Sequence, residues 1–223
     1  ATAYVQGLER AGVVATLKHF VGYSASKAGR NLAPVSVGPR ELADVLLPPF
    51  EMALRESGVR SVMNAYTDID GVPTAGDHSI LTGLLREQWG FTGTVVADYF
   101  SVGFLAALHG VVAEGDWGAA AVAALSAGID VELPTVRGYG APLAEEVRAG
   151  RLDEAVVDTA LRRVLVQKVE LGLLDTDWTP VPPALATAGD PNTADAEALR
   201  GTVELDTEEN RALAARLAER AIV

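Results

Sequence analysis

The feature that most constrains the fold is a repeated alternation of short apolar segments with helical segments. The apolar segments are rich in small or β-branched residues, and their ends follow one another at Lys18, Met63, Asp98 and Glu132. These ends are 45, 35 and 34 residues apart. Such spacings are typical of successive βα units, in which parallel strands are joined by right-handed crossovers. We therefore predict an α/β fold built on a parallel sheet.

Hydrophobic periodicity and turn signals assign the elements. We predict strands at 13–17, 60–63, 94–97 and 129–134, and helices at 4–11, 39–57, 79–89, 119–127, 141–149, 152–171 and 207–219. The double proline Pro48-Pro49 should kink or split the second helix. Ser79 and Thr207 are expected to cap the helices that they precede.

Four βα units cannot close an eight-stranded barrel, which needs about 250 residues. We expect residues 1–175 to be the second, C-terminal half of a (β/α)8 TIM-like barrel whose first half lies upstream. Residues 176–206 are rich in Pro, Ala, Thr and Asp and are predicted to form a linker. Residues 207–223 are expected to begin a truncated α/β sandwich domain, with a strand starting at Ala221.

Composition excludes several classes of function. The formal net charge of −12 over 223 residues disfavours binding to nucleic acid or to an anionic membrane. The chain has no cysteine, hence no disulfide framework and no thiolate metal site. Its three histidines are scattered, so no metal site is expected. Without a membrane span or signal-peptide pattern we expect a cytoplasmic protein, although the chain begins without methionine and a leader could precede it.

Polar and aromatic side chains follow the predicted strands. In parallel α/β folds the carboxyl ends of the strands share one face, where active sites are built. The side chains expected to converge there are Lys18, His19, Asn64, Tyr66, Asp98, Tyr99 and Glu132. Asp98 is the most informative, because a carboxylate ends an apolar strand. Its alternative role is to cap the helix that follows.

Several short motifs stand in a fixed order along the chain. They are Lys18-His19-Phe20, Gly29-Arg30-Asn31, Ser-Val-Met-Asn-Ala-Tyr at 61–66, Asp-Gly-Val-Pro at 70–73, Leu-Thr-Gly-Leu-Leu-Arg at 81–86, Trp-Gly-Phe-Thr-Gly at 89–93, Val-Ala-Asp-Tyr at 96–99 and Ala-Gly-Ile-Asp-Val-Glu-Leu-Pro at 127–134. In this order they closely resemble glycoside hydrolase family 3, of the β-glucosidase and β-xylosidase type. The resemblance runs from about residue 5 to residue 223.

The resemblance implies a retaining, exo-acting β-glycosidase that hydrolyses β-linked oligosaccharides or glycosides, with β-glucosidase ahead of β-xylosidase. Asp98 matches the family's nucleophile, although Ala97 and Tyr99 replace the flanking Ser and Trp of its usual motif. A carboxylate suits this task because it can form a glycosyl ester and leave again under attack by water.

The resemblance also implies that no cofactor is needed and that the chain carries a pocket for the non-reducing sugar. Lys18, His19 and Arg30 match residues that bind its hydroxyl groups, and their donors suit hydroxyl oxygens. Met63 matches a residue that packs on the sugar, and Tyr66 one that hydrogen-bonds the nucleophile. The pocket-mouth position of Tyr99 suggests stacking on the sugar ring.

A general acid is missing from this pattern. One branch of the family uses a histidine in the loop after the Lys-His-Phe motif, but residues 21–37 contain neither His nor Asp. The chain therefore resembles the two-domain branch, in which a glutamate of the second domain serves. Glu132 and His109 are expected to be structural, and Glu132 and Asp68, although on the right face, match no catalytic role in the family. We predict that the chain by itself is inactive or very weak.

Two other functions remain open from the residues. A class I aldolase would use Lys18 at its strand end to form a Schiff base. A non-catalytic sugar-binding module would keep Lys18, His19 and Arg30 but would not need the charge of Asp98. Nothing in the sequence indicates an oligomeric state.

Overall fold

The computed structural model describes residues 2–180, 201, 204 and 206–222. Contacts divide the chain into two compact units, Ala1–Leu173 and Leu174–Val223, which are described separately. Among the described residues, no helix combines the length and the apolar character that crossing a membrane requires.

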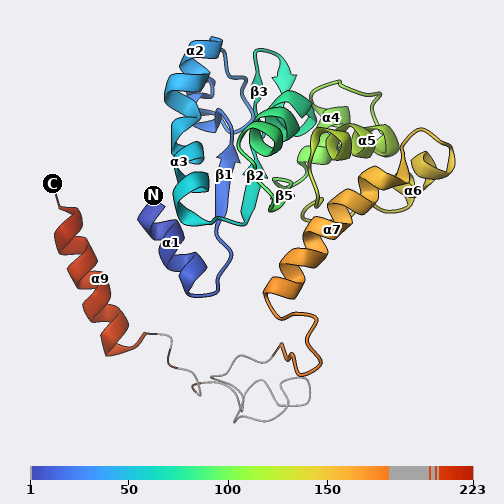
Figure 1. Ribbon diagram of the computed structural model, residues 1–223. Coiled ribbons are helices and arrows are strands. Elements are labelled where there is room, and N and C mark those ends of the chain that lie inside the picture. The colour runs from blue at the N-terminus through green and yellow to red at the C-terminus, as the bar shows by residue number, and fades with distance from the viewer. Residues whose placement is uncertain (1, 181–200, 202–203, 205, 223) are drawn as a thin grey trace. The chain divides into compact units, whose positions relative to one another are not determined.

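The first unit is built on a three-stranded parallel sheet, as predicted (Figure 1). Its strands are β1 (Thr16–Phe20), β2 (Ser61–Asn64) and β5 (Thr94–Val96), in the order β1-β2-β5. In the register, Ser61 lies between Thr16 and Thr94. The segment predicted as a fourth strand, at 129–134, contributes only one parallel bridge, between Val96 and Val131. The predicted fourth strand is therefore wrong in length, because only Val131 pairs with the sheet.

Helices and short turns connect the strands. Before and around β1 and β2 they are α1 (Thr2–Arg10), η1 (Tyr23–Ala25), η2 (Lys27–Gly29), α2 (Pro39–Glu41), η3 (Leu42–Leu46) and α3 (Pro48–Ser57). Between β2 and β5 they are a small hairpin of β3 (Asp68–Ile69) and β4 (Val72–Pro73), η4 (Thr74–Gly76) and η5 (Ser79–Gln88). After β5 come α4 (Ser101–Ala107), α5 (Trp117–Ala127), α6 (Ala141–Arg148) and α7 (Glu154–Glu170).

Local sequence signals explain most helix boundaries. The predicted split at Pro48-Pro49 is confirmed, because η3 ends at Leu46 and α3 starts at Pro48. The cap predicted at Ser79 is wrong: Oδ1 of Asp77 accepts hydrogen bonds from the amides of Ser79 and Ile80, at 2.9 and 3.3 Å. An Asp two residues earlier in the turn reaches the free amides better than the serine does.

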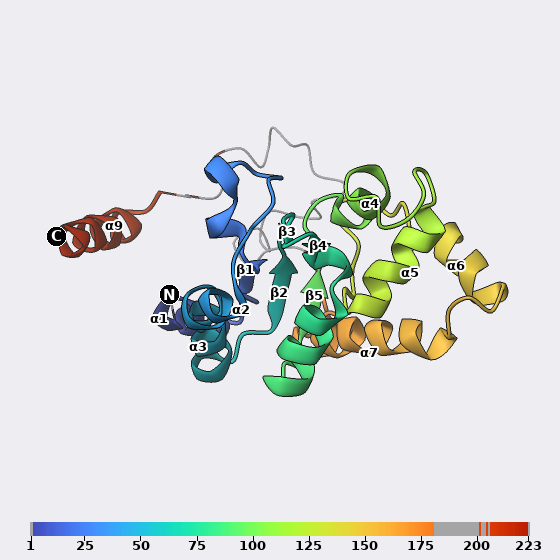
Figure 2. The same cartoon turned by 90° about the horizontal axis from the view of Figure 1, so that it is seen from above.

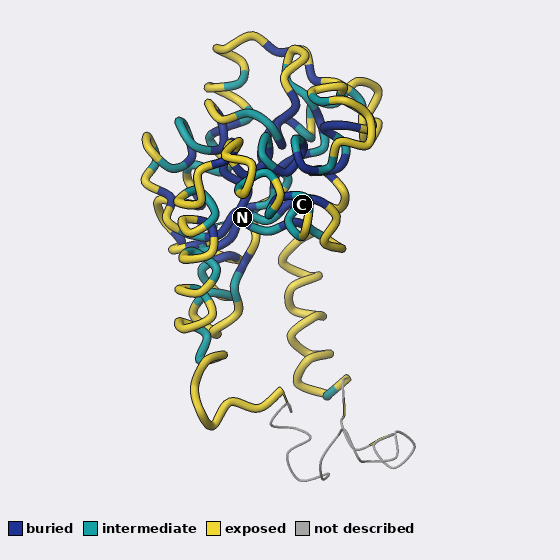
Figure 3. Tube along the Cα trace, turned by 90° about the vertical axis from the view of Figure 1, so that its right-hand side faces the viewer, coloured by how far each residue is buried: buried dark blue, intermediate teal, exposed yellow. Residues whose placement is uncertain are grey.

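The core lies between the sheet and the helices that cover it. Fully buried Phe20, Val62 and Val95, one from each strand, pack in one cluster with Leu81 and Leu85 of η5. Figure 2 looks down on the strand ends and shows α3 beside β1 and α5 beyond β5. In Figure 3 the buried residues gather in the interior of the first unit, and its outer turns are exposed.

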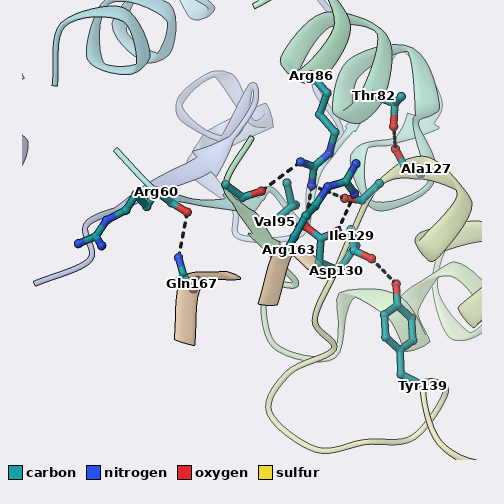
Figure 4. Close-up of polar contacts among 12 residues, drawn as sticks. Arg60, Thr82, Arg86, Val95, Ala127, Ile129, Asp130, Tyr139, Arg163 and Gln167 are labelled. Carbon is teal, nitrogen blue, oxygen red and sulfur yellow. Dashed lines mark hydrogen bonds and ion pairs between the residues drawn. The ribbon is translucent and has the colours of Figure 1, made fainter. Parts of the chain in front are cut away.

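A buried ionic cluster fixes the start of the bridging segment after α5. The carboxylate of Asp130 accepts hydrogen bonds from Arg86 (2.6 Å), Arg163 (2.8 Å) and the amide of Val95 (2.8 Å) (Figure 4). Asp130 thus ties η5 and α7 to β5. Val95 lies in β5, three residues before Asp98. The cluster therefore holds the strand that leads to Asp98.

The sheet stays open in the described part of the chain, so the predicted half-barrel appears as an α/β parallel sheet without closure. In the second unit, α9 (Glu208–Ala221) is capped as predicted, with the Thr207 hydroxyl accepting from the amide of Asn210 at 3.2 Å. The strand expected from Ala221 is not observed, because α9 includes Ala221 and Ile222 belongs to no strand. Most of the predicted linker, and residue 223, lie outside the described residues.

Candidate active site

Asp98 lies at the carboxyl end of β5 and is 7% exposed. Its amide donates to Oδ1 of Asn64 at 3.0 Å, which links the ends of β2 and β5. Its Oδ1 atom accepts from the amide of Tyr99 at 2.8 Å. Its Oδ2 atom is buried and accepts no hydrogen bond from the residues that the structure describes. One carboxylate oxygen is thus fixed by the backbone while the other keeps its lone pairs free.

Asp98 does not cap the helix that follows. Helix α4 begins at Ser101, and the residue before it is Phe100, whose φ of 67° is left-handed. Only the main-chain carbonyl of Asp98 contacts the helix start, accepting from the amide of Ser101 at 3.0 Å. The capping alternative is therefore wrong, and the carboxylate is available for another task.

His19 faces this carboxylate from β1. Its Nε2 atom lies 3.3 Å from Oδ2 of Asp98, and its ring packs on Tyr23 with 4.6 Å between ring centroids. Burial lowers the pKa of His19, and the nearby Lys18 lowers that pKa further, against the opposing effect of Asp98. The imidazole is therefore neutral at pH 7 and can donate or accept one hydrogen bond at each nitrogen.

Tyr66 lies in the loop after β2, close enough to Asp98 for the charge of that carboxylate to act on its phenol. Burial, and then the charge of Asp98, raises the pKa of Tyr66 to about 12. The phenol therefore stays protonated at neutral pH and acts as a donor. Its ring packs on Phe104 of α4, with 5.6 Å between centroids.

Two further candidate residues border the group. Met63 is half-buried in β2 beside Val96 of β5, and it is not a member of the buried apolar clusters. Tyr99 is 52% exposed, and its ring stands edge-on to Phe100 at 6.5 Å. Both side chains therefore keep solvent-accessible surface.

The remaining two candidates are less closely placed. Lys18 is exposed on β1, near enough to act on the charge state of His19. Arg30 is exposed in the loop after η2, and its side chain forms no hydrogen bond or ion pair with the described residues. Because Lys18 is exposed, it lacks the apolar surroundings that activate a lysine for Schiff-base formation.

The other carboxylates near these strand ends, Glu132 and Asp68, already accept hydrogen bonds from backbone amides. Glu132 accepts hydrogen bonds from the amides of Arg137, Gly138 and Tyr139 at 2.8–3.0 Å, so its expected structural role is supported. Asp68 accepts from the amide of Gly71 at 2.9 Å, which stabilises the turn of the β3–β4 hairpin. Among the described residues, no three His, Asp or Glu side chains gather in a way that could hold a metal ion.

Sequence reasoning missed two contributors, Tyr23 and Phe104. Tyr23 packs on His19 and its hydroxyl donates to Oδ1 of Asn31, while Phe104 packs on Tyr66. Both are aromatic residues in segments with no strand-end position, so spacing gave no signal for them. Asn64 was expected at this face and does reach Asp98.

The fold and site define a parallel α/β protein with a buried, partly unpartnered carboxylate just after strand β5, near a phenol and a neutral imidazole. Residues 1–166 match the family described as "Glycosyl hydrolase family 3 N terminal domain". The chain belongs to glycoside hydrolase family 3.

Named relatives agree with this assignment. A β-xylosidase of Formosa agariphila is 35% identical over 99% of this chain and 30% of its own length. A β-glucosidase structure from Erythrobacter marinus is 38% identical, with a TM-score of 0.77 over 93% of this chain and 25% of that chain. The Listeria innocua β-glucosidase in complex with glucose is 27% identical, with a TM-score of 0.71 over 83% of this chain and 24% of that one. The chain spans 19–30% of the length of the first curated relatives.

Proposed function

We propose that this chain carries the catalytic nucleophile, Asp98, and part of the sugar pocket of a retaining, exo-acting β-glycosidase. The observation that carries the proposal is the state of the Asp98 carboxylate: it is buried, one oxygen is fixed by the Tyr99 amide, and the other accepts no hydrogen bond from the described residues. A buried carboxylate oxygen without a partner is costly to keep, and nucleophilic attack gives it a use.

The chemistry proceeds in two displacements. Oδ2 of Asp98 attacks the anomeric carbon, the glycosidic bond breaks, and the leaving oxygen takes a proton from a general acid. Water then attacks the same carbon, with its proton passing to the conjugate base, and Asp98 leaves as a carboxylate. The Tyr66 hydroxyl stabilises the charge of Asp98 before attack and after release.

The neighbouring side chains suit a bound sugar. Neutral His19 and the ammonium of Lys18 offer donors to hydroxyl groups at one side of Asp98, and Arg30 is assigned the same task from its loop. The thioether of Met63 and the ring of Tyr99 offer apolar contact, which a pyranose face accepts. We propose a β-glucoside as the first substrate and a β-xyloside as the second, because the relatives include both β-glucosidases and β-xylosidases.

The acid/base partner is proposed to come from elsewhere in the natural polypeptide. A retaining pair of carboxyl groups stands about 5 Å apart, and Glu132 and Asp68 already accept backbone hydrogen bonds. We therefore expect the 223-residue chain to hydrolyse unactivated glycosides very weakly or not at all. Robust turnover of an alkyl β-glucoside by this chain would contradict that assignment.

Covalent trapping tests the nucleophile directly. A 2-deoxy-2-fluoro β-glucoside with a dinitrophenolate leaving group needs no general acid, so it can label Asp98 wherever the acid/base residue lies. Mass spectrometry of the peptide containing Asp98 should show one fluoroglycosyl adduct, and the corresponding xyloside should be tried in parallel. Asp98→Asn, which has nearly the same shape, is the matched control and should take no label.

Two outcomes would redirect the interpretation. A folded protein that binds glucose but labels nowhere, with Asp98→Asn binding equally well, would leave a sugar-binding module. Label on another carboxylate would move the nucleophile away from Asp98.

A further inference from the structure

Asn64 is a fully buried residue whose side chain connects the end of β2 to the segment after β5. Its Oδ1 atom accepts two hydrogen bonds, from the amide of Asp98 at 3.0 Å and from the hydroxyl of Ser101 at 3.2 Å. Its Nδ2 atom donates to the carbonyl of Ala65 at 2.7 Å. Because one end of the side-chain amide meets donors and the other meets an acceptor, the hydrogen bonds fix its orientation.

The segment after β5 leaves the sheet where it meets Asn64. Pairing between β2 and β5 ends two residues before Asp98. The amide of Ala97 donates away from β2, to the Val131 carbonyl at 2.8 Å, so the next amide, that of Asp98, points back toward β2. The Asn64 side chain accepts this hydrogen bond in place of a strand carbonyl.

A tight turn that begins at Asp98 has both of its ends on Asn64. The Asp98 carbonyl accepts from the Ser101 amide at 3.0 Å, which closes a four-residue turn, called the 98–101 turn below. Its third residue, Phe100, has a φ of 67°, a left-handed conformation that is unfavourable for a residue with a side chain. Such a conformation persists only where surrounding contacts hold it. Here Asn64 binds both ends of the turn, and the Leu133 carbonyl accepts from the Phe100 amide at 2.9 Å.

The 98–101 turn determines which oxygen of the proposed nucleophile is free. Its second residue, Tyr99, donates its amide to Oδ1 of Asp98 at 2.8 Å. Oδ2 is buried and accepts no hydrogen bond from the residues that the structure describes. Asn64 binds the first and last residues of the turn, so it acts on the Tyr99 amide through the direction of the turn. If either end moved, this amide would turn away from Oδ1 and the carboxylate could rotate.

We propose that Asn64 is a positioning residue: by holding both ends of the 98–101 turn it keeps the Tyr99 amide on Oδ1 of Asp98 and leaves Oδ2 free for attack. The importance of this for catalysis rests on the proposed function, whereas the link between Asn64 and the turn rests on the hydrogen bonds alone. An asparagine that only satisfied the Asp98 amide would leave the Tyr99 amide unchanged when it is replaced.

Amide hydrogen exchange of the full chain, followed residue by residue with ¹⁵N NMR, tests the link without any reaction. Asn64→Ala removes the acceptor, and exchange is followed at the Asp98 and Tyr99 amides. Thr74→Val is the matched control, because it removes buried hydrogen bonds to two carbonyls of the loop after β2 but none from the turn. The amides of β1 report overall unfolding in each variant.

We expect exchange at both Asp98 and Tyr99 to accelerate by about tenfold or more in Asn64→Ala, relative to β1, and to stay unchanged in Thr74→Val. A lost acceptor and an unpaired buried amide together have an effect of about this size. Acceleration at Asp98 alone would overturn the inference, because the bond from the Tyr99 amide to Oδ1 would then not depend on Asn64.

Labelling with the fluoroglycoside separates positioning from sugar binding. In Asn64→Ala the maximal rate of labelling at Asp98 should fall by about tenfold, while the half-saturating glycoside concentration stays the same. A change in the half-saturating concentration alone would overturn the inference, because it would make Asn64 a part of sugar binding.

Ser101→Ala covers the case in which Asn64→Ala does not fold. It removes one of the two bonds to Oδ1 of Asn64, so exchange at Tyr99 should accelerate by a smaller factor; unchanged exchange there in the folded variant overturns the inference. The two proposals fail differently. A responsive Tyr99 amide with no label on Asp98 of the unaltered chain would refute the glycosidase chemistry alone, whereas labelled Asp98 with an unresponsive Tyr99 amide would refute the role of Asn64 alone.

Discussion

Removing the charge of Asp130 should destabilise this protein more than removing any exposed carboxylate. The Asp130 side chain is 1% exposed and accepts from two guanidinium groups, those of Arg86 and Arg163. Asp130→Asn keeps the shape but replaces one acceptor oxygen with an NH₂ donor. That donor would face a guanidinium, and the buried Arg86 charge would lose its partner.

The size of the effect follows from burial. Breaking one side of a buried ion pair typically costs about 3–5 kcal/mol, because the remaining charge is left desolvated. The Arg148–Glu145 pair has a similar distance, 2.7 Å, but both side chains are more than 60% exposed. Glu145→Gln, the same chemical change, should therefore cost less than about 1 kcal/mol.

Urea denaturation followed by circular dichroism measures both variants on the same chain. We expect a large fall in the midpoint for Asp130→Asn and almost none for Glu145→Gln. Equal and small changes would refute the reasoning, because they would mean that solvent reaches Arg86 as easily as it reaches Arg148. Since Asp130 also binds the Val95 amide, labelling at Asp98 should slow in Asp130→Asn but not in the control.

Two further predictions concern packing and pH. Gly93→Ala should destabilise the protein by about 1–3 kcal/mol, because its added Cβ would clash with the Arg60 carbonyl oxygen. In the control Gly7→Ala, in α1, the Cβ would meet nothing within 4 Å, so urea melts should show no loss of stability or a small gain. No loss of stability in Gly93→Ala would show that β2 and β5 can separate. Burial lowers the pKa of both His19 and His109, so the unfolded chain binds more protons than the folded one below about pH 6.5. Thermal stability should therefore be full above that pH and fall as pH drops through it, less so in His19→Gln; an equal fall in that variant would exclude His19 as a cause.

Local signals explain why much of the site could be predicted. Asp98 follows the apolar segment 94–97, so the residues just before it are enough to place it at the end of a strand. His19 lies near the end of β1 and Tyr66 follows β2, so the shared carboxyl face of parallel strands was enough to bring them near Asp98. The family resemblance depended on the same residues, and the comparison with known proteins supports it.

Other features could not be predicted, because they depend on the path of a turn or loop or on the direction of a side chain. Asp77 rather than Ser79 caps η5, which depends on the path of the turn. Tyr23 joins the site only because its loop folds back over His19. Arg30 stays exposed, since sequence spacing says nothing about the direction of a side chain in a long loop.

The sequence by itself determined the parallel sheet, most of its helices and the acid that follows the third strand, because periodicity and turn residues act over a few positions. It missed helix α4, which begins just after that acid. The tertiary structure decided how that acid is held. Asp130 meets Arg163 and Arg86 across 33 and 44 residues, and Asp98 meets Asn64 across 34. Contacts of that range depend on which side chains are buried together, and only the folded chain brings them within hydrogen-bonding distance.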